Sequence, residues 1–93
     1  MTVLSSVVHV RLSPVRARER LASHLSANVV RLRDEQGLTQ QALAGLARLS
    51  RATIAQIETG QADPRLSTIE LVASALGVSP QSLLSDPRMT GRC

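Results

Sequence analysis

Side chains that could do chemistry are few in this sequence of 93 residues, and they do not form a catalytic motif. His9 and His24 are far apart in the chain and have no cysteine near them, so they do not look like metal ligands. Cys93 is the single thiol, which cannot close an internal disulfide or a zinc site. Neither a Gly-x-Ser-x-Gly motif nor a glycine-rich phosphate loop occurs. We therefore expect no enzyme, no metal and no cofactor.

The basic residues are more informative, because all eleven are arginine and the formal net charge is +4. A guanidinium group presents a planar fork that suits phosphates and guanine edges. A positive excess fits a polyanionic partner, although an arginine bias can also reflect the base composition of the gene. Phe, Tyr and Trp are all absent, which argues against proteins that stack single-stranded bases on aromatic rings.

The spacing of apolar residues predicts an all-α fold of five helices with an aliphatic core. The first helix runs from about 15 to 36, with a break near Ser23 as an alternative. The others cover 40–47, 51–59, a stretch that opens at Ser67, and a short one after Pro80. Residues that favour helix N-termini precede them; the expected caps are Ser13, Thr39, Ser50, Ser79, and Ser67 with Glu70 as a capping box.

Composition divides the chain into three parts. Residues 1–22 are an N-terminal arm and possible extension of the first helix, 23–86 are the helical domain, and 87–93 are a C-terminal tail. Within the arm, Val8, Val10 and Leu12 alternate, which fits a short strand that pairs across a dimer or binds a toxin, but also an arm without fixed structure.

The sequence predicts neither a membrane span nor a signal peptide. No apolar run approaches 18 residues, so no membrane span is expected. The first residues lack a basic region, so a signal peptide is not expected. Together with the lone cysteine, this favours a cytoplasmic protein.

The pattern that points to a function is the pair of short helices at 40–47 and 51–59, which a three-residue turn joins. This spacing is that of a helix-turn-helix, whose second helix lies in the major groove of DNA. Many helical domains contain a tight turn, so the pattern needs support from the rest of the sequence.

That support comes from residues 25–84, which resemble the lambda-repressor-like family of phage repressors, Cro and Xre-type regulators. The shared motifs, in the family's order and spacing, are Val29-x-x-Leu32-Arg33, Gly37-Leu38-Thr39-Gln40, Leu43-Ala44, Ser50-Arg51-x-Thr53-Ile54, Ile57-Glu58-x-Gly60, Pro64 and Ala75-Leu76-Gly77-Val78-Ser79. The resemblance implies a five-helix DNA-binding domain. It also implies a transcriptional regulator of bacteria or phages that binds double-stranded DNA as a homodimer on an inverted repeat and regulates its own gene.

The resemblance implies base-reading roles for three residues of the second helix, Arg51, Ala52 and Gln56. Arginine can bind guanine with two hydrogen bonds, glutamine can bind adenine in the same way, and alanine can touch a thymine methyl. The alternatives are a phosphate contact for Arg51 and a solvated surface position for Gln56.

Backbone contacts are implied at a wider set of positions. Gln40 matches a family position that binds a phosphate and steadies the first residue of the recognition helix. Ser50 fits a helix cap better than a base contact, and Arg65 is the strongest candidate in the loop because it is charged. The full set is Gln40, Ser50, Thr53, Thr59, Gln61 and Arg65.

Two further features concern structure. Arg33 and Glu58 match a family ion pair, partly buried, between the first and third helices; the alternative is two separate surface charges. Arg48 occupies a turn position that is commonly glycine in the family and often has a positive φ angle, which costs another residue about 1 kcal/mol.

Three further features concern a dimer surface, an alternative function and the basic residues near the N-terminus. By analogy with the family, the homodimer interface is expected at Val78, Pro80, Leu83 and Leu84, although the leucines could instead complete the core. The alternative function is an antitoxin or another protein-interaction module on the same fold. Arg16, Arg18 and Arg20 could reach phosphates or a minor groove, or form a solvated helix face.

Overall fold

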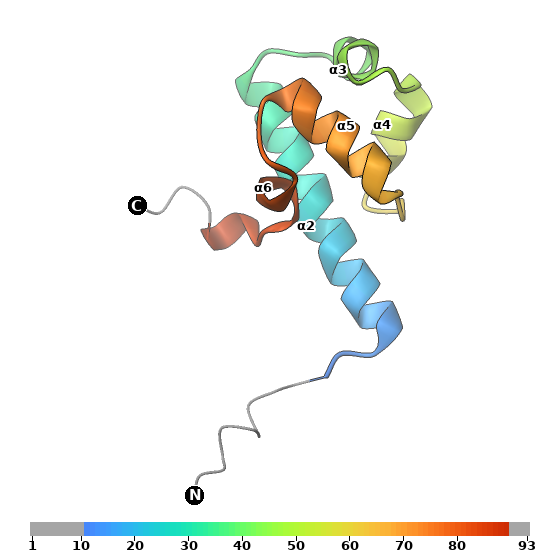
Figure 1. Cartoon of the computed structure of the whole chain (residues 1–93). Helices are drawn as coiled ribbons and strands as arrows, with labels where there is room; N and C mark the ends of the chain where they lie inside the picture. Colours follow the sequence, from blue (N-terminus) through green and yellow to red (C-terminus); the bar gives the residue numbers. More distant parts are fainter. Residues whose placement is uncertain (1–10, 90–93) are drawn as a thin grey trace, which may run out of the picture.

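The structure of the protein is a computed structural model that describes residues 11–89, and all regular secondary structure in this part is helical (Figure 1). The elements are α2 (Pro14–Glu35), α3 (Gln40–Ala47), α4 (Arg51–Glu58), α5 (Leu66–Leu76), α6 (Pro80–Leu84) and the 3₁₀ helix η1 (Pro87–Met89). Helix α2 is the longest, and the other helices gather around its C-terminal half while its N-terminal end projects beyond them (Figure 1). The predicted all-α arrangement of five helices is confirmed.

Helix α2 is continuous, so the alternative of a break near Ser23 is not observed. It begins where predicted, because the Ser13 side chain accepts a hydrogen bond from the Arg16 amide and Pro14 occupies the first turn. It ends before Gly37, whose φ of 70° suits glycine. Of the predicted N-terminal strand, Val8 and Val10 lie outside the described residues, and Leu12 is not in a strand.

The start of α5 differs from the prediction. The helix begins at Leu66 with Arg65 as its N-cap, and no side chain caps it. The Ile69 amide donates to the Arg65 carbonyl at 3.1 Å, so the first helical turn begins at Arg65 and already includes Ser67. Ser67 therefore lies within the helix, and the predicted capping box of Ser67 and Glu70 is wrong.

The core is aliphatic, as the absence of aromatic residues requires. It brings together the buried faces of all five helices; its fully buried hydrophobic members include Val29, Leu43, Ile54, Ile57, Val72 and Leu83. One polar side chain shares this core: Asn28 is fully buried and donates to the carbonyls of Leu83 and Ser85 at 2.8 and 2.9 Å. These bonds satisfy the buried amide and fasten α6 to α2.

The stretch after α6 contains ordered structure. Helix η1 packs against α2 and lies within residues 87–93, which the sequence assigned to a tail. The Arg88 amide and guanidinium both donate to the Asp86 carboxylate, at distances of 2.9 to 3.2 Å. Helix α2 also contacts α6, where His24 Nδ1 lies 3.2 Å from the Leu84 carbonyl.

Candidate nucleic-acid interface

Helices α3 and α4 form the predicted helix-turn-helix. The Ser50 hydroxyl accepts a hydrogen bond from the Thr53 amide at 3.1 Å, so Ser50 is a helix cap as expected. Ile54 and Ile57 are buried, which fixes the inner face of α4. The opposite face is exposed and carries the three predicted base-reading residues, Arg51, Ala52 and Gln56.

The turn between α3 and α4 contains the one non-glycine residue with a positive φ in the described part of the chain. Arg48 adopts the left-handed conformation, with φ 60° and ψ 44°. This is the conformation that the family's usual glycine adopts without strain. The turn keeps the helix-turn-helix shape, so the substitution affects its energy rather than its path.

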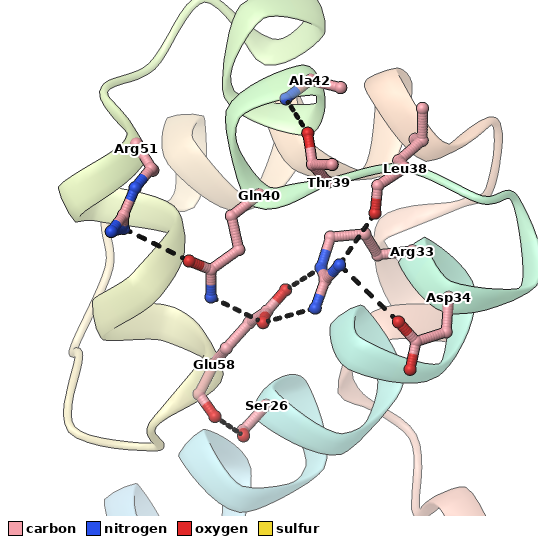
Figure 2. Close-up of polar contacts among 9 residues, drawn as sticks. All are labelled: Ser26, Arg33, Asp34, Leu38, Thr39, Gln40, Ala42, Arg51 and Glu58. Atoms are coloured by element: carbon pink, nitrogen blue, oxygen red, sulfur yellow. Dashed lines mark hydrogen bonds and ion pairs between the residues drawn. The ribbon is translucent and has the colours of Figure 1, made fainter.

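An ion pair holds α4 against α2 (Figure 2). Arg33 Nε donates to Glu58 Oε2 at 2.6 Å, and Arg33 Nη2 donates to Glu58 Oε1 at 3.1 Å. The side chains are 16% and 7% exposed, so the predicted partly buried pair is confirmed. Arg33 Nη1 also donates to the Leu38 carbonyl at 2.7 Å, and the Ser26 hydroxyl donates to the Glu58 carbonyl at 2.6 Å. The C-terminal end of α4 is therefore fixed to α2 by both side-chain and main-chain bonds.

The ion pair extends through Gln40 to Arg51 (Figure 2). Gln40 Nε2 donates to Glu58 Oε1 at 3.0 Å, and Arg51 Nη1 donates to Gln40 Oε1 at 3.3 Å. A carboxylate only accepts hydrogen bonds and a guanidinium only donates them. Both neighbours therefore require the same orientation of the Gln40 amide. This chain of polar contacts links the buried pair to the first exposed residue of α4.

The surroundings of Glu58 keep it ionised. Burial by itself would raise the pKa of Glu58, but the hydrogen bonds from Arg33 and Gln40 and the charge of Arg33 outweigh this effect and lower it below its ordinary value. The pKa of Arg33 is raised, chiefly by its hydrogen bond to Glu58. Glu58 is thus an acceptor for both partners at neutral pH.

The sequence alone did not indicate that Glu58 bonds to Gln40. The two residues are separated by 18 positions and lie on different helices, so only the packing of α3 against α4 brings them together. The available signal was the resemblance, which placed Gln40 next to the first residue of the recognition helix and Glu58 in an ion pair, without connecting the two.

Most of the predicted backbone-contact residues line one open hollow at the other end of α4. The hollow has a volume of about 830 Å³ and lies between α4, the loop 60–65 and the start of α5. Its lining includes Thr53, Gln56, Thr59, Gln61 and Arg65. Gln40 and Ser50, at the N-terminal ends of α3 and α4, are not part of this lining. Ser50 is nevertheless joined to this lining, since its hydroxyl lies 2.9 Å from the Thr53 hydroxyl. The candidate residues therefore extend along α4 from its N-terminal end to the loop 60–65.

The predicted dimer residues are not equivalent in the structure. Leu83 is fully buried in the protomer core, which corrects the expectation that its side chain faces a partner. Val78, Pro80 and Leu84 are partly exposed. Leu84 lines a shallow, mainly apolar groove of about 210 Å³ together with Leu21, Leu66 and others.

Comparison with known proteins identifies the family. Residues 29–83 match the helix-turn-helix family HTH_3, a span of more than half the chain. The chain belongs to this family. It is thus a lambda-repressor-like helix-turn-helix protein of the Xre type, a family of transcriptional regulators rather than enzymes. The resemblance that the sequence motifs indicated is confirmed.

The chain is similar in sequence to a phage repressor and to a bacterial transcriptional regulator. The chain is 44% identical over 55 residues to the immunity repressor protein of Bacillus phage phi105 and 31% identical over 70 residues to the transcriptional regulator SutR of Escherichia coli. These matches cover 59% and 75% of this chain, but only 38% and 39% of the two relatives. The chain thus spans well under half the length of these curated relatives.

Solved structures agree in fold. The hypothetical transcription factor NHTF from Neisseria superposes with a TM-score of 0.72 at 32% identity, over 76% of this chain and 80% of that one. The restriction-modification controller protein C.AhdI from Aeromonas hydrophila gives a TM-score of 0.64 at 32% identity, over 67% of this chain and 94% of that one.

Other kinds of site are not found between residues 11 and 89. No cluster of histidine, cysteine and acidic side chains suited to a metal ion occurs there. Among the helices described, none is both long and apolar enough to cross a membrane.

Proposed function

We propose that the protein is a sequence-specific repressor that binds double-stranded DNA as a homodimer on an inverted repeat, including DNA at its own gene. The observation that carries the proposal is the exposed face of α4, on which Arg51 is oriented by Gln40 and Glu58. A helix of this kind enters the major groove with its N-terminal residues against the bases.

In this proposal Arg51 binds a guanine through O6 and N7, and Gln56, beyond it along α4, binds an adenine. Ala52 packs against a thymine methyl between them. Arg51 Nη1 is engaged by Gln40 in the free protein, which leaves the other nitrogens of its guanidinium for the base.

Backbone contacts flank this readout. Gln40 and the first amides of α3 bind a phosphate on one side of the groove, because the N-terminus of a helix favours anions. Thr53, Thr59, Gln61 and Arg65 face the backbone on the other side, where they line one hollow. Phosphate contacts of this kind position the protein but carry no sequence information.

The dimer is proposed from the three predicted residues that are not buried in the core, Val78, Pro80 and Leu84. Val78 and Pro80 are partly exposed between the end of α5 and the first turn of α6, and Leu84 is partly exposed at the end of α6. Two copies joined there would present their α4 helices to half-sites about 34 Å apart, one turn of DNA. Sedimentation at rising protein concentration tests this surface. Val78→Gln should shift the protein toward monomer, whereas Leu46→Gln, on exposed α3 surface, should not.

Repression is proposed by analogy with the phage immunity repressor, and autoregulation by analogy with the family. The test is fluorescence anisotropy with DNA from upstream of the gene, a random-sequence duplex as control, and several salt concentrations. Tight binding to the upstream DNA that weakens steeply with salt supports the proposal. If the protein prefers no duplex, even after selection from a random library, the proposal is wrong and a protein-interaction role takes its place.

A further inference from the structure

The positive charge of this protein is concentrated at the N-terminal end of α2. Residues 11–22 contain four arginines and one glutamate, whereas residues 23–88 contain six arginines and six acidic residues. The helix-turn-helix domain proper is therefore formally neutral. DNA binding depends strongly on the neutralisation of phosphates by basic side chains, so a neutral domain lacks much of the electrostatic attraction that its proposed function needs.

This end of α2 does little for the fold. The buried residues of α2 are Leu25, Asn28 and Val29, all in its C-terminal half. No residue from 14 to 24 is fully buried, and the match to the HTH_3 family begins only at residue 29. The projecting turns (Figure 1) therefore carry arginines whose positions neither the core nor the family explains.

The same end of α2 lies beside the proposed DNA-facing loop. Arg18 and Glu19 line a small hollow together with Gly60, Gln61 and Asp63 of that loop. Arg18 Nη1 is 3.9 Å from Asp63 Oδ2, and the two side chains are 60% and 72% exposed. This distance exceeds that of a hydrogen bond, so the Arg18 guanidinium keeps its donors free for a stronger acceptor.

We propose that the basic end of α2 is a second DNA-backbone site, which binds phosphates beyond those that the loop 60–65 reaches. Arg18 makes the contact nearest the loop and exchanges Asp63 for a phosphate, a better-matched acceptor for its planar fork. Arg16 and Arg20 lie one helical turn apart on another side of α2 and add to the attraction. This inference rests on the proposed function, since it extends the same DNA surface.

The test compares two double variants that each remove two positive charges. Arg16→Gln with Arg18→Gln removes one arginine from each side of the basic end. The control is Arg31→Gln with Arg88→Gln, which removes the same charge away from the basic end of α2. Arg31 contacts Asn28, and Arg88 pairs with Asp86 near η1. Circular dichroism and sedimentation are used first to check that both variants keep the fold and the oligomeric state of the parent.

The measurement is binding to a labelled random-sequence duplex over a range of salt concentrations. We expect the Arg16/Arg18 variant to lose about 0.9 in the slope of log affinity against log salt for each phosphate contact removed. For two contacts, the advantage of the parent over the variant shrinks by about tenfold between about 50 and about 200 mM salt. The control should keep the slope of the parent.

Equal slopes for the two variants would overturn the inference, because a solvated helix face and a general charge effect both predict that result. If the parent itself binds no duplex, the proposed function fails as well. A second readout is the preference for a selected site over random DNA. This preference should stay unchanged in the variant with Arg16→Gln and Arg18→Gln, since phosphate contacts carry no sequence information. A changed preference would assign these arginines to base reading instead.

Discussion

Arginine has very different surroundings beneath α4 and at the N-terminal end of α2. Arg33 is 16% exposed and donates hydrogen bonds to Glu58 and to the Leu38 carbonyl. Arg18 is 60% exposed and only approaches Asp63, at 3.9 Å. The first arrangement fixes the angle between two helices, and the second leaves a cation available to a partner. The same residue type thus stabilises the fold in one region and supplies charge in the other, and its burial and hydrogen bonds decide which.

The largest expected effect is at the buried pair. Glu58→Ala should lower the free energy of unfolding by about 3 kcal/mol, because it leaves Arg33 largely buried without its partner. The measurement is urea-induced unfolding at pH 7. Glu35→Ala is the matched control, since Glu35 pairs with Arg31 on the exposed surface of α2 and should lose less than about 0.5 kcal/mol. Equal losses in the two variants would contradict the comparison.

The pair also gives a pH dependence. The pKa of Glu58 is lowered in the folded protein, so its ionisation stabilises the fold above the pKa of the unfolded chain. This stabilisation is lost as the pH falls through the lower, folded pKa. The free energy of unfolding of the parent should therefore decrease in acid more than that of Glu58→Gln. Parallel curves for the two proteins would show that Glu58 does not cause the decrease.

Arg51 has features of both regions, because it is an exposed arginine whose position the polar contacts of Gln40 and Glu58 determine. Arg51→Ala should cost specific DNA binding about 1–3 kcal/mol and relax the preference at one base pair. Gln40→Met should relax the preference at that same base pair, since it removes the acceptor that orients Arg51. Binding to variant operators measures both. If Gln40→Met leaves the preference unchanged, the polar chain from Glu58 has no role in readout.

At Arg48 we expect the backbone conformation to affect the free energy of unfolding more than the side chain does. Its φ of 60° is costly for any residue with a Cβ, so Arg48→Gly should raise the free energy of unfolding by about 1 kcal/mol. Gly77 has a φ of 75° and open space around it, so Gly77→Ala should have the opposite sign and similar size. Thermal unfolding measures both. If Arg48→Gly destabilises the protein, the arginine side chain stabilises the turn by more than the backbone strain costs.

Features set by local sequence were predictable. Ser13, Thr39, Ser50 and Ser79 each cap a helix, as their types and positions predicted. The start of α5 was not predictable in this way. The capping box at Ser67 is a local preference, and the path of the loop 60–65 overrides it. In that path the chain already turns into a helix directly after Arg65.

Contacts between distant parts of the chain set the limit of prediction at the candidate site. The Arg33–Glu58 pair was indicated only by the resemblance, and the bond from Gln40 to Glu58 not at all, since hydrophobic periodicity gives the inner face of a helix but not which polar residues meet. The burial of Asn28 against the end of α6 was equally hidden, because it joins residues 55 positions apart. Such contacts depend on how helices cross, which the packing of the whole core determines.

The smallest expected effect is at Arg88. This arginine has an ion-pair partner but is not buried, so it tests whether pairing alone stabilises the fold. Arg88 makes a two-point contact with Asp86 yet is 87% exposed. Hydrogen bonds from its side chain and then its backbone amide lower the pKa of Asp86 to about 2. The direction of this shift means that any stabilisation by the carboxylate is present above its ordinary pKa of about 4 and lost as the pH falls through about 2. Its size is small, because solvent screens a pair whose arginine is 87% exposed. Arg88→Gln should raise the pKa of Asp86 measured by NMR titration, but change unfolding at pH 7 very little, because solvent screens an exposed pair. If Arg88→Gln destabilised the protein as much as Glu58→Ala, hydrogen-bond geometry rather than burial would decide what an arginine contributes here.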